Sequence, residues 1–423
     1  MPYITIPVQP KQYQLTFEDI MFGVKSSVFN NVPKNTYDTR TVYRSETPQK
    51  LLENLDINHL IEILKAFNDK HRNLIEMEDK SALYHHFQIP KRSGGWRPID
   101  APNPELDAAL RELKYIFETK FYARYHTSAF AYIEKRSTMT AVERHQKNES
   151  KWFLKIDLHN FFGKTTKEFV MARLSTIYPF SEIVVFPSGE TALSDALSLA
   201  FLNGGLPQGT PISPLITNLM MIPVDHAISK VSREHTPFIC YTRYADDMTF
   251  SAVSSFEDRQ LLWDIKTLGE SIDELKDKPS NGGRQAKMKK LIEQLGAKIE
   301  QTNFLKSIIE ILKKFDAPFE INAKKTHYGN SNGRNWILGV MLNKDNQITL
   351  GHIKKNNLKV DIYNFMKDYS NGSPWSVSEA QSLDGTISYH KQIEKELTEK
   401  MLRNYSNKFG RDVVETIRSV ISG

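Results

Sequence analysis

Two adjacent carboxylates interrupt an apolar stretch of the chain, and they constrain its fold more than any other feature. Asp246 and Asp247 lie within Tyr241–Ser251, whose other residues are mainly aromatic, apolar or β-branched. Such a run predicts two β-strands joined by a tight turn. Neighbouring side chains of a strand point to opposite faces, so an acidic pair at a hairpin tip directs at least one carboxylate into a site. A site that receives this charge indicates a bound cation.

An exposed turn is the simpler interpretation, because aspartate is a favoured turn residue. A second acidic strand end weighs against it. The apolar segment Trp152–Phe162 contains a single acid, Asp157, followed by an aromatic turn. Two acidic strand ends can hold two magnesium ions about 3.5–4 Å apart, which stabilise the attacking and the leaving oxygens of phosphoryl transfer. The pattern is typical of a polymerase palm.

Further segments resemble those of prokaryotic reverse transcriptases, a group that includes retron, group II intron and defence-associated enzymes. The resemblance covers roughly residues 80 to 355. Its blocks follow the family's order, and they are Gly94–Pro102, Trp152–Phe162, Leu206–Leu219, Tyr244–Asp247, Asn322–Thr326 and Ile337–Gly339. The resemblance implies an α+β fold of the right-hand polymerase type, with fingers, a palm and a helical thumb.

The expected domains follow from these blocks and from helical spacing elsewhere. Residues 1–80 are expected to form an N-terminal arm and helices, 81–150 the fingers, 151–350 the palm and 351–423 the helical thumb. Apolar residues at helical spacing on both sides of a glycine-rich break predict a helical insertion at about 256–315. At the N-terminal side, Asn58 is the expected cap of a helix that carries Leu60 and Phe67 on one face.

The resemblance assigns metal ligands in the palm. Asp157, Asp246 and Asp247 are the implied catalytic ligands of two Mg²⁺ ions, and the main-chain carbonyl of Leu158 is a further implied ligand. Lys325, or its neighbour Lys324, matches a lysine near the triphosphate that acts as a general acid on pyrophosphate. Gln208 matches a residue that touches the incoming nucleotide.

Other implied substrate contacts have plain structural alternatives. Arg97 and Lys91 match basic residues over the incoming triphosphate, where Arg97 would bind phosphate bidentately and Lys91 would act as a compact charge. A solvated basic hairpin would show the same residues. Phe162 falls where the family places a ring that excludes the 2′-hydroxyl of a ribonucleotide, and core packing is its alternative. For Phe161 we expect core packing.

Composition excludes several classes of protein. Hydrophobic residues make up 40% of the 423 positions and aromatic residues 11%, values typical of a folded globular chain. The net charge of +6 favours a polyanionic partner. Cys240 is the only cysteine, which excludes an intramolecular disulfide and a multi-cysteine metal site. No window is long and apolar enough to span a membrane, so we expect a cytoplasmic protein without a membrane partner.

The expected function is an RNA-directed DNA polymerase that copies a noncoding RNA with deoxynucleotides and Mg²⁺ to give a DNA product. Retron enzymes carry an Asn-Ala-x-x-His signature and a Val-Thr-Gly turn, whereas this chain has Thr140–His145 and Ile337–Gly339. These departures and the insertion favour a defence-associated enzyme that acts against phage. A retron enzyme that makes RNA-linked single-stranded DNA is the alternative.

Two further classes stay open at this stage. One is a template-independent or protein-primed DNA polymerase, and the other is an RNA-binding scaffold that keeps a palm only for its shape. A protein effector and a homo-oligomer are further partners that the chain leaves open.

Overall fold

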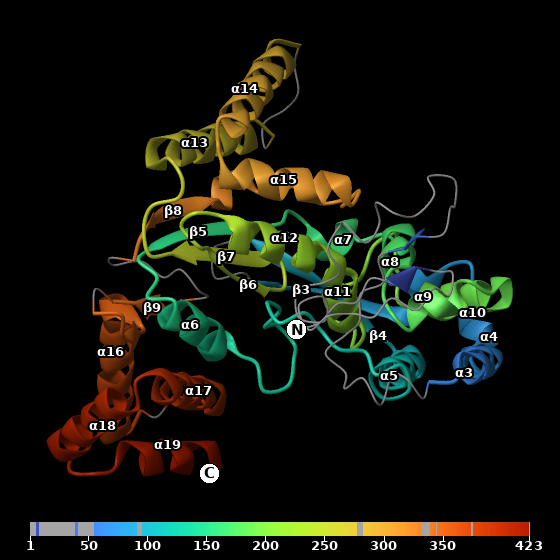
Figure 1. Cartoon of the computed structure of the whole chain (residues 1–423). Helices are drawn as coiled ribbons and strands as arrows, with labels where there is room; N and C mark the ends of the chain where they lie inside the picture. The colour runs from blue at the N-terminus through green and yellow to red at the C-terminus, as the bar shows by residue number, and fades with distance from the viewer. Residues whose placement is uncertain are drawn as a thin grey trace.

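The computed structural model describes residues 6–7, 39–40, 55–90, 95–276, 282–331, 339–343, 345–373 and 375–422. Figure 1 shows a central β-sheet, a lobe of C-terminal helices below it, and a pair of helices that projects from the opposite side. Helices and strands occupy separate parts of the architecture, which confirms the α+β class. No helix in these described ranges is both long and apolar enough to cross a bilayer.

The central sheet is antiparallel and has the strand order β6-β7-β5-β8. Its strands are β5 (Trp152–Asp157), β6 (Cys240–Tyr244), β7 (Asp247–Ala252) and β8 (His327–Asn330). The β6–β7 pairing joins Tyr244 to Asp247 across a turn of two residues, which confirms the predicted hairpin. In β5, Leu154 and Ile156 belong to the main hydrophobic core, whereas Lys155 and Asp157 alternate onto the other face. The sheet therefore has one face packed on helices and one face that carries charge.

The main core unites the sheet with the helices that precede and follow it. The elements between residues 55 and 150 are α3 (Ile57–Lys70), α4 (Arg72–Ile75), η2 (Lys80–Leu83), β3 (Tyr84–Pro90), β4 (Trp96–Pro102), α5 (Pro104–Thr119) and α6 (Thr138–Lys147). Strands β3 and β4 form an antiparallel hairpin. The cap of α3 is Asp56, whose carboxylate accepts from the backbone N–H of Asn58 and of His59. The expected cap at Asn58 is wrong, because the helix starts one residue earlier and Asn58 already belongs to its first turn.

Short helices fill the sequence between the two acidic strand ends. They are α7 (Phe161–Lys164), α8 (Lys167–Leu174), α9 (Phe180–Ile183), α10 (Pro187–Ser198), α11 (Ser213–Met220) and α12 (Ile222–Glu234). Helix α11 is almost entirely buried, whereas α12 buries one face and exposes Lys230, Arg233 and Glu234. They form the support behind the β6–β7 hairpin.

Three helices occupy the region of the expected insertion. They are α13 (Arg259–Lys276), α14 (Gly282–Glu300) and α15 (Phe304–Lys314), and the turn η3 (Ala323–Lys325) follows them. Helix α15 packs on α12 and on the main core, whereas α14 projects away from the body of the protein. Gly269 of α13 lies against η3, and a Cβ atom there would be 2.7 Å from the Lys324 backbone nitrogen.

The C-terminal helices have a hydrophobic core of their own. This part contains β9 (Met341–Leu342), β10 (Ile348–Thr349), α16 (Gly351–Ser370), α17 (Val377–Ile393), α18 (Lys395–Phe409) and α19 (Val413–Ser422). A smaller cluster joins Val340 and Leu350 to Phe153 of the sheet. Gly339 is the described residue of the expected primer-positioning turn, and its carbonyl accepts from Lys354 Nζ at 2.8 Å. Ile337 and Leu338 lie outside the described residues. Of the short strands β1 (Ile6–Pro7) and β2 (Thr39–Arg40), the structure describes only the backbone.

Candidate active site

The three predicted carboxylates meet at one end of the charged face of the sheet. Asp157 ends β5, and its Cα partner across the β5–β7 ladder is Asp247, the first residue of β7. Asp246 occupies the turn before it, and its carbonyl accepts from the Leu158 N–H at 3.1 Å. These contacts join three acids from two distant segments of the chain.

The closeness of the three acids changes the pKa values of two of them. Burial, with the charges of Asp247 and Asp157, raises the pKa of Asp246 to about 6. Burial also raises the pKa of Asp247, while the Lys155 ammonium opposes that rise. Like charges held in a partly desolvated site favour protonation or a bound cation. The site is therefore suited to receive positive charge.

Two lysines bond to these acids. Lys325 Nζ lies 3.1 Å from Asp157 Oδ1, and Lys155 Nζ lies 3.0 Å from Asp247 Oδ2. Within the described ranges no three carboxylate, imidazole or thiol side chains, these acids included, are oriented as they stand to share one metal ion. The lysine ammonium groups take up part of the negative charge instead.

The donor set nevertheless fits divalent cations that prefer oxygen. In extended backbone the N–H and C=O of one residue point to the same side, so the Leu158 carbonyl points with its N–H toward the Asp246 turn. Asn322 Nδ2 donates to Asp157 Oδ1 at 3.3 Å and helps to orient that carboxylate. Carboxylate oxygens with one carbonyl are hard ligands of the kind that Mg²⁺ binds.

A buried arginine holds the acidic turn. Arg243 Nη1 donates to the Ala245 carbonyl at 3.2 Å and to Asn218 Oδ1 at 3.3 Å. Ala245 has a φ of 57°, in the left-handed region that a residue with a Cβ rarely adopts. The arginine therefore fixes a strained turn and ties it to α11.

The loop that carries Gln208 lies between Phe162 and β4. The Leu206 N–H donates to the Phe162 carbonyl at 3.0 Å, and the Gln208 carbonyl accepts from the Asp100 N–H at 2.8 Å. Gly209 has a φ of 120°, and a Cβ atom there would be 2.9 Å from Ile99 Cγ2. This tight packing holds the Gln208 loop between Phe162 and β4. The side chains of Gln208 and Phe162 are half-buried.

The predicted basic residues of the β3–β4 hairpin have different outcomes. Arg97 is exposed on β4, and its charge lowers the pKa of the Tyr132 phenol, which burial and Asp246 raise. Arg97 and Asp246 therefore both lie close to Tyr132. Lys91 lies outside the described residues.

The two phenylalanines after the first acid differ as expected. Phe161 is buried in the main core, where its ring packs edge-on against Phe162 and at a tilt against Phe319. Phe162 is only partly covered and lies at the rim of the core. Core packing of Phe161 is confirmed, whereas the role of Phe162 at the sugar stays a prediction.

Sequence reasoning missed several residues of the site. Lys155 stands two positions before Asp157, and strand periodicity would have placed both on one face. His145, part of the segment compared with the retron signature, is buried and bonds through Nε2 to Thr242 at 2.7 Å and through Nδ1 to Ser251 at 2.5 Å. Burial lowers its pKa to about 3. Asn218 lies in the matched block Leu206–Leu219, but its bond to Arg243 arises only in the tertiary fold, and Tyr132 carried no signal in the sequence.

An antiparallel sheet with three acids on its open face, buried helices behind it and a helical lobe beside it defines a right-hand nucleic-acid polymerase. The family model described as "Reverse transcriptase (RNA-dependent DNA polymerase)" matches residues 89–342, more than half of the chain. The chain belongs to this reverse transcriptase family, and it is an RNA-directed DNA polymerase.

Its relatives include retron enzymes. The chain is 25% identical to the retron Ec83 reverse transcriptase of Escherichia coli over 80% of this chain and 91% of that protein. It is 32% identical to the retron Mx162 reverse transcriptase of Myxococcus xanthus, over 41% of this chain and 36% of that protein. A solved telomerase from Candida albicans aligns with 10% identity and a TM-score of 0.39, over 86% of this chain and 65% of that one. The chain is thus similar in sequence to retron reverse transcriptases.

Proposed function

We propose that this polymerase copies a noncoding RNA into DNA with two Mg²⁺ ions held by Asp157, Asp246, Asp247 and the Leu158 carbonyl. The observation that carries the proposal is the convergence of three partly desolvated acids at one end of the sheet. When bound, the ions would neutralise charge on the reacting phosphate and on the attacking and leaving oxygens. The protein's own contribution is then mainly positioning.

The transfer exchanges one phosphorus–oxygen bond for another. The 3′-hydroxyl oxygen of the primer bonds to the α-phosphorus of a deoxynucleoside triphosphate, and the bond to the pyrophosphate oxygen breaks. The hydroxyl proton leaves to solvent, and the pyrophosphate takes up a proton. In this proposal Lys325 donates that proton to the leaving pyrophosphate, and its contact with Asp157 at 3.1 Å supports a position close to the acids.

Selection of the nucleotide falls to residues around the acids. Phe162 excludes the ribose 2′-hydroxyl by its bulk, and Gln208 contacts the nucleotide from the rigid loop beside it. Arg97, exposed on β4, binds the triphosphate, and Lys91 assists it. The half-buried position of Phe162 supports this role, because the ring is held by the core while one side stays open.

The template is the least constrained part of the proposal. The retron names of the relatives favour a retron-type product, in which single-stranded DNA is linked to its RNA. The departures at Thr140–His145 and Ile337–Gly339 favour a different defence enzyme that acts against phage in the cytoplasm. Both versions use a partner RNA, deoxynucleotides and a DNA product, and a protein effector or a homo-oligomer belongs to either.

Sequencing of copurifying nucleic acid tests the proposal. The protein is purified from cells that carry its native locus, with Asp246→Ala and Asp247→Ala combined as the inactive variant. DNA complementary to one small RNA, present only with the intact acids, is the expected result. Glu76→Ala combined with Glu78→Ala removes two exposed acids far from the site and serves as the matched control.

Each other outcome favours a named alternative. DNA without a complementary RNA indicates template-independent or protein-primed synthesis. RNA that is bound equally by the inactive variant, with no DNA in either sample, indicates a scaffold. A ribose-linked DNA end separates the retron version from other priming, and a plaque assay with the inactive variant tests the defence role.

A further inference from the structure

Helix α14 projects from helix α13, which itself packs on η3 and β8, and a polar contact joins the two helices. Lys298 Nζ of α14 lies 2.8 Å from Asp264 Oδ2 of α13, and Gln260 Nε2 donates to the other oxygen of that carboxylate at 2.9 Å. None of the described side chains of α14 is fully buried. We call this pair, residues 259–276 and 282–300, the arm. Figure 1 shows α14 extending away from the central sheet.

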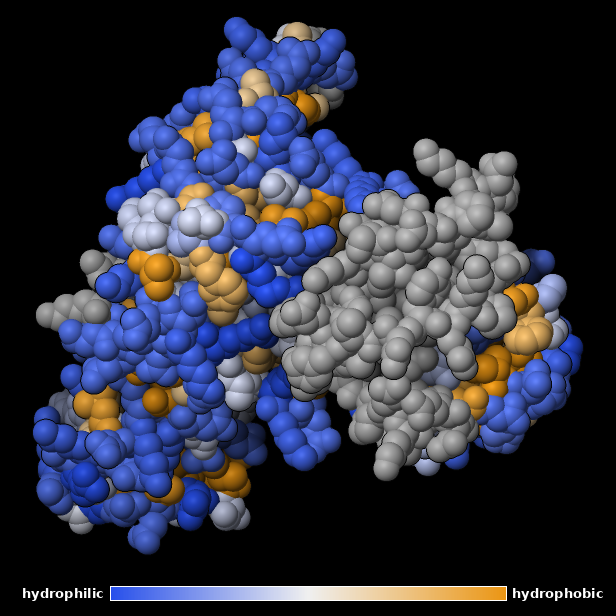
Figure 2. Space-filling model, in the orientation of Figure 1, coloured by the Kyte–Doolittle hydropathy of each residue, from blue (hydrophilic) through white to orange (hydrophobic). Residues whose placement is uncertain are grey.

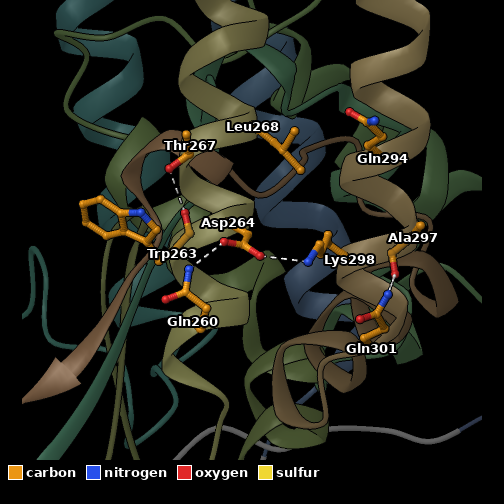
Figure 3. Close-up of a pocket in the computed structure, with 9 residues that line it drawn as sticks. All are labelled: Gln260, Trp263, Asp264, Thr267, Leu268, Gln294, Ala297, Lys298 and Gln301. Carbon is orange, nitrogen blue, oxygen red and sulfur yellow. Dashed lines mark hydrogen bonds and ion pairs between the residues drawn. The ribbon is translucent and has the colours of Figure 1, made fainter.

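An open hollow of about 530 Å³ lies at the base of the arm. Its lining is rich in amide and hydroxyl groups, and it consists of Gln260, Trp263, Asp264, Thr267, Leu268, Gln294, Ala297, Lys298 and Gln301. Figure 3 shows Asp264 and Lys298 pointing toward each other between the helices, while the Trp263 ring projects from α13 on the outer side. Trp263 is 57% exposed, so much of its ring is open to contact from outside the protein. A flat aromatic surface beside amide groups is suited to a nucleobase.

Uncompensated positive charge lies further out along the arm. Lys287, Lys289 and Lys290 are exposed, and no ion pair joins them to any acid in the described part of the chain. By contrast, Lys266 and Lys276 of α13 each have an acidic partner on their own helix. Figure 2 shows the outer end of the arm as mainly hydrophilic. The distance from these lysines to Lys298 is roughly 15 Å along the helix, which a few nucleotides can span.

We infer that the arm binds a single-stranded segment of the partner RNA outside the catalytic cleft. The inference rests on the proposed function in taking RNA as the partner. Lys287, Lys289 and Lys290 contact phosphates, Trp263 stacks on an unpaired base, and the amides of the hollow bond to base edges. Trp263 and Ile292 are the large apolar side chains exposed on the described arm, too few for the apolar centre of a protein interface.

Binding of a labelled single-stranded RNA of mixed sequence tests the inference. A saturating excess of unlabelled RNA–DNA primer–template fills the cleft, so that fluorescence polarisation reports the remaining surface. Lys287→Gln, Lys289→Gln and Lys290→Gln combined should weaken binding about tenfold and lower the slope of log Kd against log salt by about two. Trp263→Ala should weaken binding about tenfold with little change in that slope.

Matched variants control for charge and for exposed aromatic area. Lys65→Gln, Lys70→Gln and Lys230→Gln combined remove three paired cations elsewhere, and Tyr115→Ala removes a side chain that is 58% exposed. Neither control should change the affinity for the RNA. Thermal melting of all variants establishes that each is folded.

Primer extension on a short RNA template separates this inference from the proposed function. The arm variants should extend the primer with unchanged kcat and KM. Unchanged RNA affinity in the folded arm variants overturns the inference and leaves the surface to a protein partner or to solvent. Loss of extension together with RNA binding also overturns it, because the arm would then belong to the cleft. If the unaltered protein extends no primer, the proposed function fails whatever the arm binds.

Discussion

Arg243 and Asp225 form an ion pair whose side chains are both completely buried. Arg243 Nε lies 2.9 Å from Asp225 Oδ1, and Nη2 lies 2.8 Å from Oδ2, so the two groups meet through two parallel hydrogen bonds. Tyr241 donates to the same carboxylate at 2.7 Å. The pair joins α12 to the strand that leads into Asp246. Its position, three residues before the first acid of the turn, indicates that it holds the turn in place.

Breaking this pair should cost both stability and activity. Arg243→Met leaves the Asp225 charge buried without a cation to pair with, and we expect a loss of about 3–5 kcal/mol in the free energy of unfolding. Urea denaturation measures that loss. The combination with Asp225→Leu should recover much of the stability but not primer extension, because the Ala245 carbonyl still lacks its donor. Full activity in the double variant would show that the pair does not position the turn.

Asp246→Asn should make the protein more stable while it abolishes synthesis. The folded-state pKa of about 6 lies above the ordinary 3.8, so stability falls as the pH rises through that window. At pH 7.5 without Mg²⁺ the substitution should therefore raise the free energy of unfolding by about 2 kcal/mol. Thermal melting with and without Mg²⁺ checks this. Mg²⁺ should raise the melting temperature of the unaltered protein but not that of the Asp246→Asn variant. If the variant without Mg²⁺ melts at a lower temperature than the unaltered protein without Mg²⁺, the acids do not repel one another as proposed.

Gly269→Ala should disturb the active site from a distance. The new Cβ would meet the Lys324 nitrogen at 2.7 Å and Ala323 Cβ at 2.8 Å, so α13 and the turn that carries Lys325 must move apart. We expect a loss of about 1–3 kcal/mol in the free energy of unfolding and a reduced kcat.

Gly296→Ala is the matched control for Gly269→Ala, because nothing lies within 4 Å of its new Cβ. It should stabilise α14 by up to about 1 kcal/mol and leave kcat unchanged. Equal kinetics for the two variants would exclude coupling between α13 and Lys325.

Phe162→Ala should allow ribonucleotides into the product. Removal of the ring opens the space beside the sugar, so the ratio of kcat/KM for deoxynucleotides over ribonucleotides should fall, mainly through a gain with ribonucleotides. Phe162→Tyr keeps the bulk and should preserve the ratio. Steady-state incorporation of each nucleotide type measures both. An unchanged ratio in the folded alanine variant would assign Phe162 to core packing instead.

His145 should make the stability of the protein depend on pH. Its pKa falls from 6.5 to about 3 on folding, so the unfolded chain binds a proton that the folded protein excludes, and stability declines as the pH falls below 6.5. Between pH 7.5 and 5.5 this one residue should account for about 1.4 kcal/mol of the decline. Urea denaturation should show that His145→Gln is less stable than the unaltered protein at neutral pH. Its stability should fall less than that of the unaltered protein between pH 7.5 and 5.5. The exposed His59→Gln should retain the full decline.

Local patterns in the sequence were sufficient for the strands and the acids. The alternation around Asp157 and the turn residues Ala245 and Asp246 define a strand end and a hairpin by short-range sterics, which do not depend on the rest of the chain. The order of the blocks then led to the α+β polymerase fold. The sequence did not predict Asp56 as the cap of α3, because a few competing hydrogen bonds decide where a helix ends.

Only the tertiary structure decided how the site is held. The register that sets Asp157 opposite Asp247, the burial of Arg243 against Asp225, and the contact of Gly269 with the Lys325 turn all join segments that are far apart in sequence. Such contacts depend on which surfaces the hydrophobic core brings together, and local sequence patterns do not predict them. The residue types that perform the chemistry could thus be read from the sequence, whereas the buried pairs that position them required the folded chain.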